Sequence, residues 1–357
     1  MIIGRMKLLE LARKASKAIR PSITPIKESL KIEAVDGKLQ ITGMSTEMLI
    51  CAYDEIEDNT SFTCVVTAKI FTDILNKMVS DTVELSLVKS DSDEIDVLVI
   101  KGGISSLNIQ TFDAASWSDL PEFTPKIKLK VNPKYFQDCA HALSKSDDRG
   151  PIIECYHIEE MESGYKIVAL DGFRISERIS SPKGVVVNDF IINGEFIKTA
   201  LSIAGDDITI ETDDEKIRVS KPGISIYGQM TNGSYFNIKA FEAISASTSL
   251  TLVREDLLDA IRVSAIMDDS LVFDTDCKTL KIGSRRDIGK SNSELPILSA
   301  SGETRSAQFA LKANYIADAL NSITDEYVTI ELPEDLRAVF MKGEDYLEFI
   351  LPRLIKK

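Results

Sequence analysis

KIFTDILNKMVSDTVELSL, residues 69–87, combines an amphipathic helix with an alternating strand, and two later segments repeat the combination. The later copies are EFIKTALSIAGDDITIETD at 195–213 and NYIADALNSITDEYVTIEL at 314–332. Each passes an acidic turn and enters a strand whose apolar residues alternate, as in a half-buried antiparallel strand. The copies start about 120 residues apart, roughly one third of the chain, which indicates an internal repeat.

A second element recurs at the same period. Amphipathic helices are predicted at 6–20, 132–148 and 254–269, and strand-rich segments with turn signals follow them. Chance similarity between α+β segments is the alternative, but two different elements recurring in phase argue against it. The prediction is an α+β protein of three domains, residues 1–123, 124–246 and 247–357, each with two helices packed on antiparallel sheets. The boundaries fall near the connectors 117–126 and 235–247.

The composition of the 357-residue chain limits the class of protein. The five cysteines, at 51, 64, 139, 155 and 277, form no CxxC pair, so we expect a reducing cytoplasm and no disulfide framework. No apolar run is long enough for a transmembrane helix, so we expect no membrane partner. The basic N-terminus lacks the apolar core of a signal peptide, and a mitochondrial transit peptide is the rival interpretation, against which Glu10 argues.

The formal net charge of −14 argues against nucleic acid as a partner, but binding responds to the local field. On a helical wheel of residues 6–20, the apolar residues Leu8, Leu11, Ala12, Ala15 and Ile19 share one sector. The opposite side carries Lys7, Arg13, Lys14, Lys17 and Arg20. This almost purely positive face suits a phosphate backbone, and an ordinary solubilising face is an equal alternative. Contacts of this kind would carry no sequence information.

Catalytic chemistry is poorly represented. His141 falls in a predicted helix and His157 in a strand, and we expect structural roles for both. The GKS at 289–291 lacks the upstream glycine of a phosphate-binding loop, and the acidic run 90–96 lacks the glycine of a calcium loop. No catalytic residue, metal site or cofactor is therefore predicted, although catalysis by carboxylates alone stays open.

ALDGFRIS, residues 169–176, places an Asp-Gly pair among apolar residues, which predicts a tight hairpin turn with an apolar tip. Together with the three-fold repeat, RPSITPI at 20–26 and LEFILPRLI at 347–355, it resembles the bacterial DNA polymerase III beta subunit family, the sliding clamps. The resemblance covers essentially the whole chain and rests on the order and spacing of short motifs. The more usual family turn is Ala-Thr-Asp-Gly-His-Arg-Leu, so Leu170 and Phe173 are departures.

The resemblance implies a non-enzymatic processivity factor: a head-to-tail homodimer closed into a ring, with helices lining a pore that encloses duplex DNA. It also implies that the replicative polymerase, the clamp loader and repair proteins insert a short peptide between the second and third domains. A clamp-like adaptor, encoded by a phage or plasmid, that binds peptides without productive DNA loading is the alternative.

The resemblance assigns residues to each role by position. For the peptide pocket these are Ile152, Leu170, Gly172, Phe173, Arg174, Ile175, Phe236, Phe241, Tyr315, Leu336, Ala338, Phe349, Leu351 and Pro352. For the pore they are Lys7, Arg13, Lys14, Lys17, Arg20, Lys77, Arg149 and Lys198. For the dimer interface they are Leu107 and Ile109, facing Ile266 and Met267 of the other copy.

Overall fold

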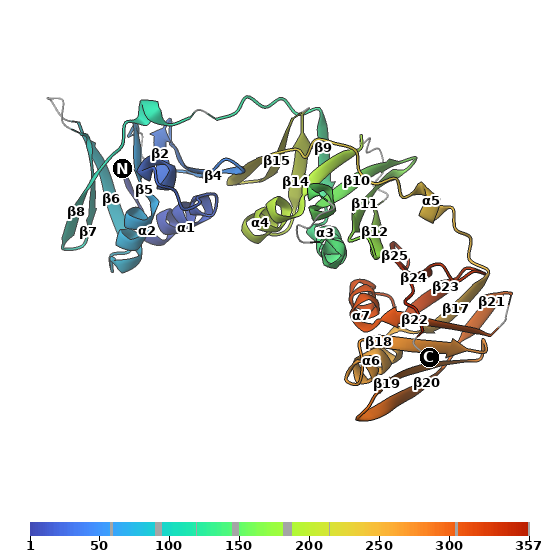
Figure 1. Cartoon of the computed structure of the whole chain (residues 1–357). Helices are drawn as coiled ribbons and strands as arrows, with labels where there is room; N and C mark the ends of the chain where they lie inside the picture. The colour runs from blue at the N-terminus through green and yellow to red at the C-terminus, as the bar shows by residue number, and fades with distance from the viewer. Residues whose placement is uncertain are drawn as a thin grey trace. The chain divides into compact units, whose positions relative to one another are not determined.

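The structure, a computed structural model, describes residues 1–57, 60–89, 95–118, 120–144, 150–180, 188–213, 215–303 and 306–355. The chain divides into two compact units. Figure 1 labels the helices and strands that are named below. The first unit is Met1–Pro133 with Glu195–Met230, and the second is Lys134–Gly194 with Thr231–Lys357. Each unit combines parts of two predicted domains, so the boundaries at residues 123 and 246 stay predictions.

The structure contains a helix within each predicted helical segment: α1 (Arg5–Ser16), α2 (Ala68–Lys77), α3 (Pro133–Cys139), α4 (Gly194–Ala204), α6 (Arg254–Ala265) and α7 (Ala313–Ser322). A short helix, α5 (Lys239–Glu242), lies in the second connector. The prediction that the first helix runs to residue 20 is wrong. The amides of Ala18 and Ile19 bond three residues back, and Pro21 follows Arg20, so the chain leaves the helix after Ser16. The helix predicted at 132–148 is likewise shorter, because a 3₁₀ turn at Ala140–Ala142 follows α3.

The described residues of the first unit form two antiparallel sheets. A four-stranded sheet has the order β1 (Ile2–Gly4), β6 (Thr82–Val88), β7 (Val97–Gly102) and β8 (Ser105–Gln110). An eight-stranded sheet has the order β5 (Phe62–Thr67), β2 (Ser29–Val35), β3 (Lys38–Met44), β4 (Met48–Glu55), β16 (Ile224–Gln229), β15 (Lys216–Lys221), β14 (Ile208–Thr212) and β9 (Ile127–Val131). Pairing of β4 with β16 therefore joins strands of the first and second predicted domains in one sheet.

The second unit has the same design. A nine-stranded sheet has the order β13 (Phe190–Asn193), β10 (Cys155–Met161), β11 (Gly164–Leu170), β12 (Arg174–Ser180), β25 (Tyr346–Ile350), β24 (Val339–Lys342), β23 (Tyr327–Leu332), β17 (Thr248–Val253) and β21 (Ser299–Gly302). A four-stranded sheet has the order β20 (Gly289–Pro296), β19 (Thr279–Arg286), β18 (Ser270–Thr275) and β22 (Ala307–Lys312). Here the β12–β25 pairing joins strands of the second and third predicted domains. The predicted α+β class with antiparallel sheets is confirmed.

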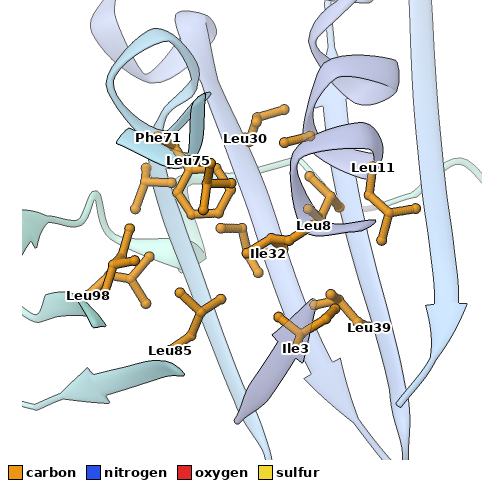
Figure 2. Close-up of a cluster of buried hydrophobic side chains, with 14 of the residues drawn as sticks. Ile3, Leu8, Leu11, Leu30, Ile32, Leu39, Phe71, Leu75, Leu85 and Leu98 are labelled. Carbon is orange, nitrogen blue, oxygen red and sulfur yellow. The ribbon is translucent and has the colours of Figure 1, made fainter. Parts of the chain in front are cut away.

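The helices of the first unit bury their apolar faces on these sheets. Figure 2 shows Leu8 and Leu11 of α1 and Phe71 of α2 gathered around Ile32 of β2. All four side chains are at most 6% exposed. Burial of such side chains contributes about 1.5–3 kcal/mol each, which makes this apolar stripe the main reason that the helices dock.

An arginine at the start of a helix repeats one interaction in both units. The Nη1 of Arg5, the first residue of α1, donates to the carbonyl of Leu75 at 2.9 Å, and its Nε donates to that of Ser80 at 2.8 Å. Arg254, the first residue of α6, does the same with Leu320 and Asp325, both at 3.0 Å. Each arginine thus satisfies one carbonyl in the last turn of the neighbouring helix and one carbonyl three residues beyond that helix. The repeat therefore extends to single hydrogen bonds.

Candidate functional site

The ALDGFRIS segment forms the predicted hairpin turn between β11 and β12. Leu170 pairs with Ile175 across it, and Gly172 has a φ of +84°, which glycine accepts without strain. The Oδ1 of Asp171 accepts the amide hydrogens of Phe173 at 2.9 Å and Arg174 at 3.1 Å. These bonds fix the turn and leave the Phe173 side chain 52% exposed at its tip.

Behind the turn lies an apolar cluster, which we call the docking cluster. The β12–β25 pairing sets Ile175 opposite Phe349, so residues far apart in sequence meet on one sheet. Buried members of the docking cluster are Ile153, Val168, Leu170, Ile175, Ile238, Ala338, Phe340 and Phe349, with Tyr235, Ile244, Leu347 and Leu351 packed against them. Of the residues assigned to the peptide pocket, the structure therefore brings Leu170, Ile175, Ala338, Phe349 and Leu351 together.

Three phenylalanines in this unit keep a large exposed area. Phe173 is 52% exposed, Phe236 46% and Phe241 38%. The Phe241 ring packs edge-on against Phe349 with centroids 5.0 Å apart, so it extends the docking cluster towards solvent. The assigned residues Ile152, Leu336 and Pro352 are half-buried, and each lies within two residues of a docking-cluster member in the chain.

The side chain of Arg174 bonds to groups of its own chain. Its side chain is 6% exposed, its Nε donates to Asp171 at 3.0 Å, and its Nη1 donates to Asp318 of α7 at 2.7 Å. Its Nη2 donates to the carbonyl of His141, and its guanidinium lies 4.3 Å from the centre of the Tyr315 ring. Arg174 and Tyr315 are both assigned to the pocket. The contacts of Arg174 with Asp318 and Tyr315 hold the turn against α7.

Both histidines sit in packed environments. The Nε2 of His141 lies 2.9 Å from the Ser176 hydroxyl and 3.2 Å from the carboxylate of Glu348, which is fully buried. The Tyr346 hydroxyl donates to the same carboxylate at 2.6 Å, and burial raises the Tyr346 pKa well above its usual value. His157 stacks on Tyr235 with centroids 4.8 Å apart, and burial lowers its pKa. The network around Glu348 had no sequence signal, because its members come from three separate segments.

The first helix gathers basic residues along a groove of about 460 Å³, lined by Met6, Lys7, Leu9, Glu10, Arg13, Lys14 and Lys17. Four of the eight residues assigned to the pore therefore share one surface. Lys77 is exposed at the end of α2, and Lys198 lies on α4. Arg149 lies outside the described residues.

The expectation of an almost purely positive face is wrong in one respect: many of these cations have partners. Lys7 lies 2.8 Å from Asp54, Lys14 2.6 Å from Glu10, Arg20 3.9 Å from Glu47 and Lys198 3.2 Å from Glu195. Arg13 donates to Asn76 at 2.8 Å and Lys17 to Ser202 of α4 at 3.2 Å. Glu10 lies on the helix itself, whereas Asp54 on strand β4, Glu47 in the 44–48 turn and Glu195 on α4 lie outside the 6–20 wheel.

The residues assigned to the dimer interface lie on or beside the edge strands of two sheets and just after helix α6. β8 ends the order of its sheet, and Leu107 on it is 37% exposed, whereas Ile109 is 6% exposed and packs in the core of the first unit. In the second unit, Ile266 follows α6 and is 74% exposed. The half-buried Met267 lies beside Gly289 of β20, which ends the order of its own sheet.

Comparisons with known proteins show what the chain as a whole is similar to. A family model described as the DNA polymerase III beta subunit, N-terminal domain, matches residues 1–121. The beta sliding clamp of Rickettsia felis is 19% identical over 367 residues, covering 96% of this chain and 95% of the relative. The solved sliding clamp of Bacillus subtilis superposes with a TM-score of 0.87 at 18% identity, covering 99% of both chains.

The chain has the sliding-clamp fold. The beta subunit of Streptococcus pyogenes gives the same TM-score of 0.87, at 18% identity and 99% coverage of both chains. A Pseudomonas aeruginosa sliding clamp, solved bound to griselimycin, gives 0.85 at 16% identity, again with 99% coverage of both chains. The resemblance predicted from the sequence is confirmed. Among the described residues, no helix has the length and apolar character needed to cross a bilayer.

Proposed function

We propose that this protein is a DNA polymerase processivity factor without catalytic activity, which encircles duplex DNA in the cytoplasm and tethers partner proteins through short peptides. The observation that carries the proposal is the convergence of the assigned apolar residues. Leu170 and Ile175 come from the first chain segment of the second unit, and Phe349 and Leu351 come from its second segment. These four residues form one cluster beside exposed phenylalanines. Such a surface offers apolar anchors to a peptide, which is how short linear segments gain affinity.

The DNA would be held by phosphate contacts without sequence preference. The groove along α1 presents Lys7, Arg13, Lys14 and Lys17. The ion pairs of Lys7 and Lys14 are exposed at the surface, where such pairs contribute only about 0–1 kcal/mol, so a phosphate can replace the carboxylate. Weak, exchangeable contacts suit a protein that must move along DNA while being retained topologically.

Two copies would close the ring head to tail. The edge strand β8 of one copy, with Leu107, would meet the region of β20, Ile266 and Met267 of the other. Exposed edge strands and apolar side chains are an aggregation hazard that a closed interface removes. The partners of the ring would be the replicative polymerase, the clamp loader and other proteins carrying a docking peptide.

The test is retention on circular DNA. The protein should behave as a dimer by light scattering at micromolar concentration. After treatment with the clamp loader of the same organism, it should co-elute with nicked circular plasmid and be lost when the plasmid is linearised. A monomer that is never retained would contradict the proposal.

The peptide-binding adaptor remains the second candidate function, because the ion pairs of Lys7, Lys14, Arg20 and Lys198 reduce the positive charge available to DNA. A dimer that binds peptides but is not retained on loaded plasmid would favour it.

A further inference from the structure

One face of the nine-stranded sheet carries both the docking cluster and a charged cluster. Along β11, Lys166, Val168 and Leu170 alternate onto this face. The register sets Glu159 of β10 opposite Lys166 and Glu177 of β12 opposite Val168. The apolar residues at one end of the face belong to the docking cluster, and the charged residues surround Lys166.

Lys166 is the centre of the charged cluster. Its side chain is 7% exposed, and its Nζ lies 3.2 Å from Glu159 and 3.7 Å from Glu177. The same ammonium bonds to Glu242 of the connector helix α5. One buried cation therefore holds three carboxylates from three elements together. Without it, like charges at this spacing would repel one another and push the connector away from the sheet.

The connector lies over both parts of this face. Its Tyr235 stacks on His157, its Ile238 is 3% exposed in the docking cluster, and its Glu242 bonds to Lys166. Phe241, the neighbour of Glu242, packs on Phe349. A helix as short as α5 is not stable by itself, so its position depends on the side chains that hold it at each end.

We propose that Lys166 is a positioning residue for peptide docking: by holding Glu242 it fixes α5 over the sheet, and so places the Phe241 ring against Phe349 at the edge of the docking cluster. This inference rests on the proposed peptide-docking function. It predicts that a residue buried under the connector, out of reach of any bound peptide, controls peptide affinity through Phe241.

The experiment compares the unmutated protein with Lys166→Met. A second variant, Glu242→Gln, keeps Lys166 paired with its two partners on the sheet and so protects the test against misfolding. Lys342→Met is the control, because Lys342 forms a Lys–Glu pair on the same sheet, 3.5 Å from Glu331. The probe is a fluorescein-labelled decapeptide with a central Leu-Phe pair, and the readouts are fluorescence anisotropy and hydrogen–deuterium exchange of residues 235–244.

Lys166→Met and Glu242→Gln should each weaken binding of the probe about tenfold and speed hydrogen–deuterium exchange across the connector. Lys342→Met should change neither the affinity nor the exchange. The decisive measurement adds Phe241→Ala to each background. Phe241→Ala should weaken binding in the unmutated protein, but should have little further effect beside Lys166→Met, because the ring is already misplaced there. A residue that merely stabilised the fold would leave the effect of Phe241→Ala unchanged.

The outcomes separate the two proposals. If the unmutated protein binds the probe, and both variants bind it equally well with unchanged exchange, the positioning role is overturned and the docking function stands. If the two effects of Lys166→Met and Phe241→Ala simply add, the positioning role is overturned as well. If the unmutated protein does not bind the probe, the docking function fails and the positioning role fails with it, whatever the exchange shows.

Discussion

Truncating Phe173 gives a quantitative test of the docking surface. A phenylalanine side chain offers about 200 Å² for burial, and Phe173 is 52% exposed, so a peptide that covers it completely would bury about 100 Å² more. At about 25 cal/mol per Å², this burial contributes about 2.5 kcal/mol. Phe173→Ala should therefore lower the affinity for a docking peptide by up to about 70-fold.

The assay is fluorescence anisotropy with the Leu-Phe decapeptide, accompanied by urea denaturation. Because the ring is exposed, Phe173→Ala should change the free energy of unfolding by no more than about 0.5 kcal/mol. Leu298 has the same exposed fraction, 52%, on the segment between β20 and β21, so Leu298→Ala is the matched control and should leave affinity unchanged. A loss of less than about threefold for Phe173→Ala would refute the reasoning, since the peptide would then not cover the turn.

Other predictions concern stability and assembly. Arg5→Met should lower the free energy of unfolding by about 2 kcal/mol in urea, because two carbonyls lose a charged donor; Arg13→Met, which loses one exposed bond, should cost far less. Ile266→Glu should convert the dimer to a monomer in light scattering at micromolar concentration, and a persistent dimer would exclude this residue from the interface. Burial raises the pKa of Glu177 to about 7, against the coulombic pull of Lys166 and with the repulsion of Glu242 and Glu159. The contribution of Glu177 to the free energy of unfolding is therefore full below about pH 4.5 and is lost as the pH rises through 7. Glu177→Gln should flatten stability against pH across this window by up to about 1.4 kcal/mol per pH unit, and an unchanged slope would contradict the assignment.

Local patterns were enough to predict the repeated helix–strand units. The segments at 69–87, 195–213 and 314–332 fold as α2–β6, α4–β14 and α7–β23, because amphipathic periodicity and alternation report which face of each element is buried. The end of the first helix was mispredicted for the same reason. Ile19 is apolar and packs on the core, so it satisfies the helical pattern although the chain has already left the helix.

The site could be predicted only where a resemblance supplied positions. The cluster of Leu170, Ile175 and Phe349 depends on the β12–β25 pairing, which no local pattern reveals. The partners of Arg174 come from His141 and from Asp318, which lies 144 residues away. Buried charges such as Lys166 are also invisible in sequence, because a lysine in an alternating strand is normally expected on the solvent face.

The pairing of β4 with β16 and of β12 with β25 limits how this chain can be divided. A fragment that stopped at residue 123 would keep β4 but lose the strand that covers its backbone amides and carbonyls. A fragment beginning at residue 247 would likewise present β25 without β12. Each cut would leave an unpaired edge open to another chain, so recombining thirds between relatives would favour aggregation unless the exchanged strands kept compatible registers.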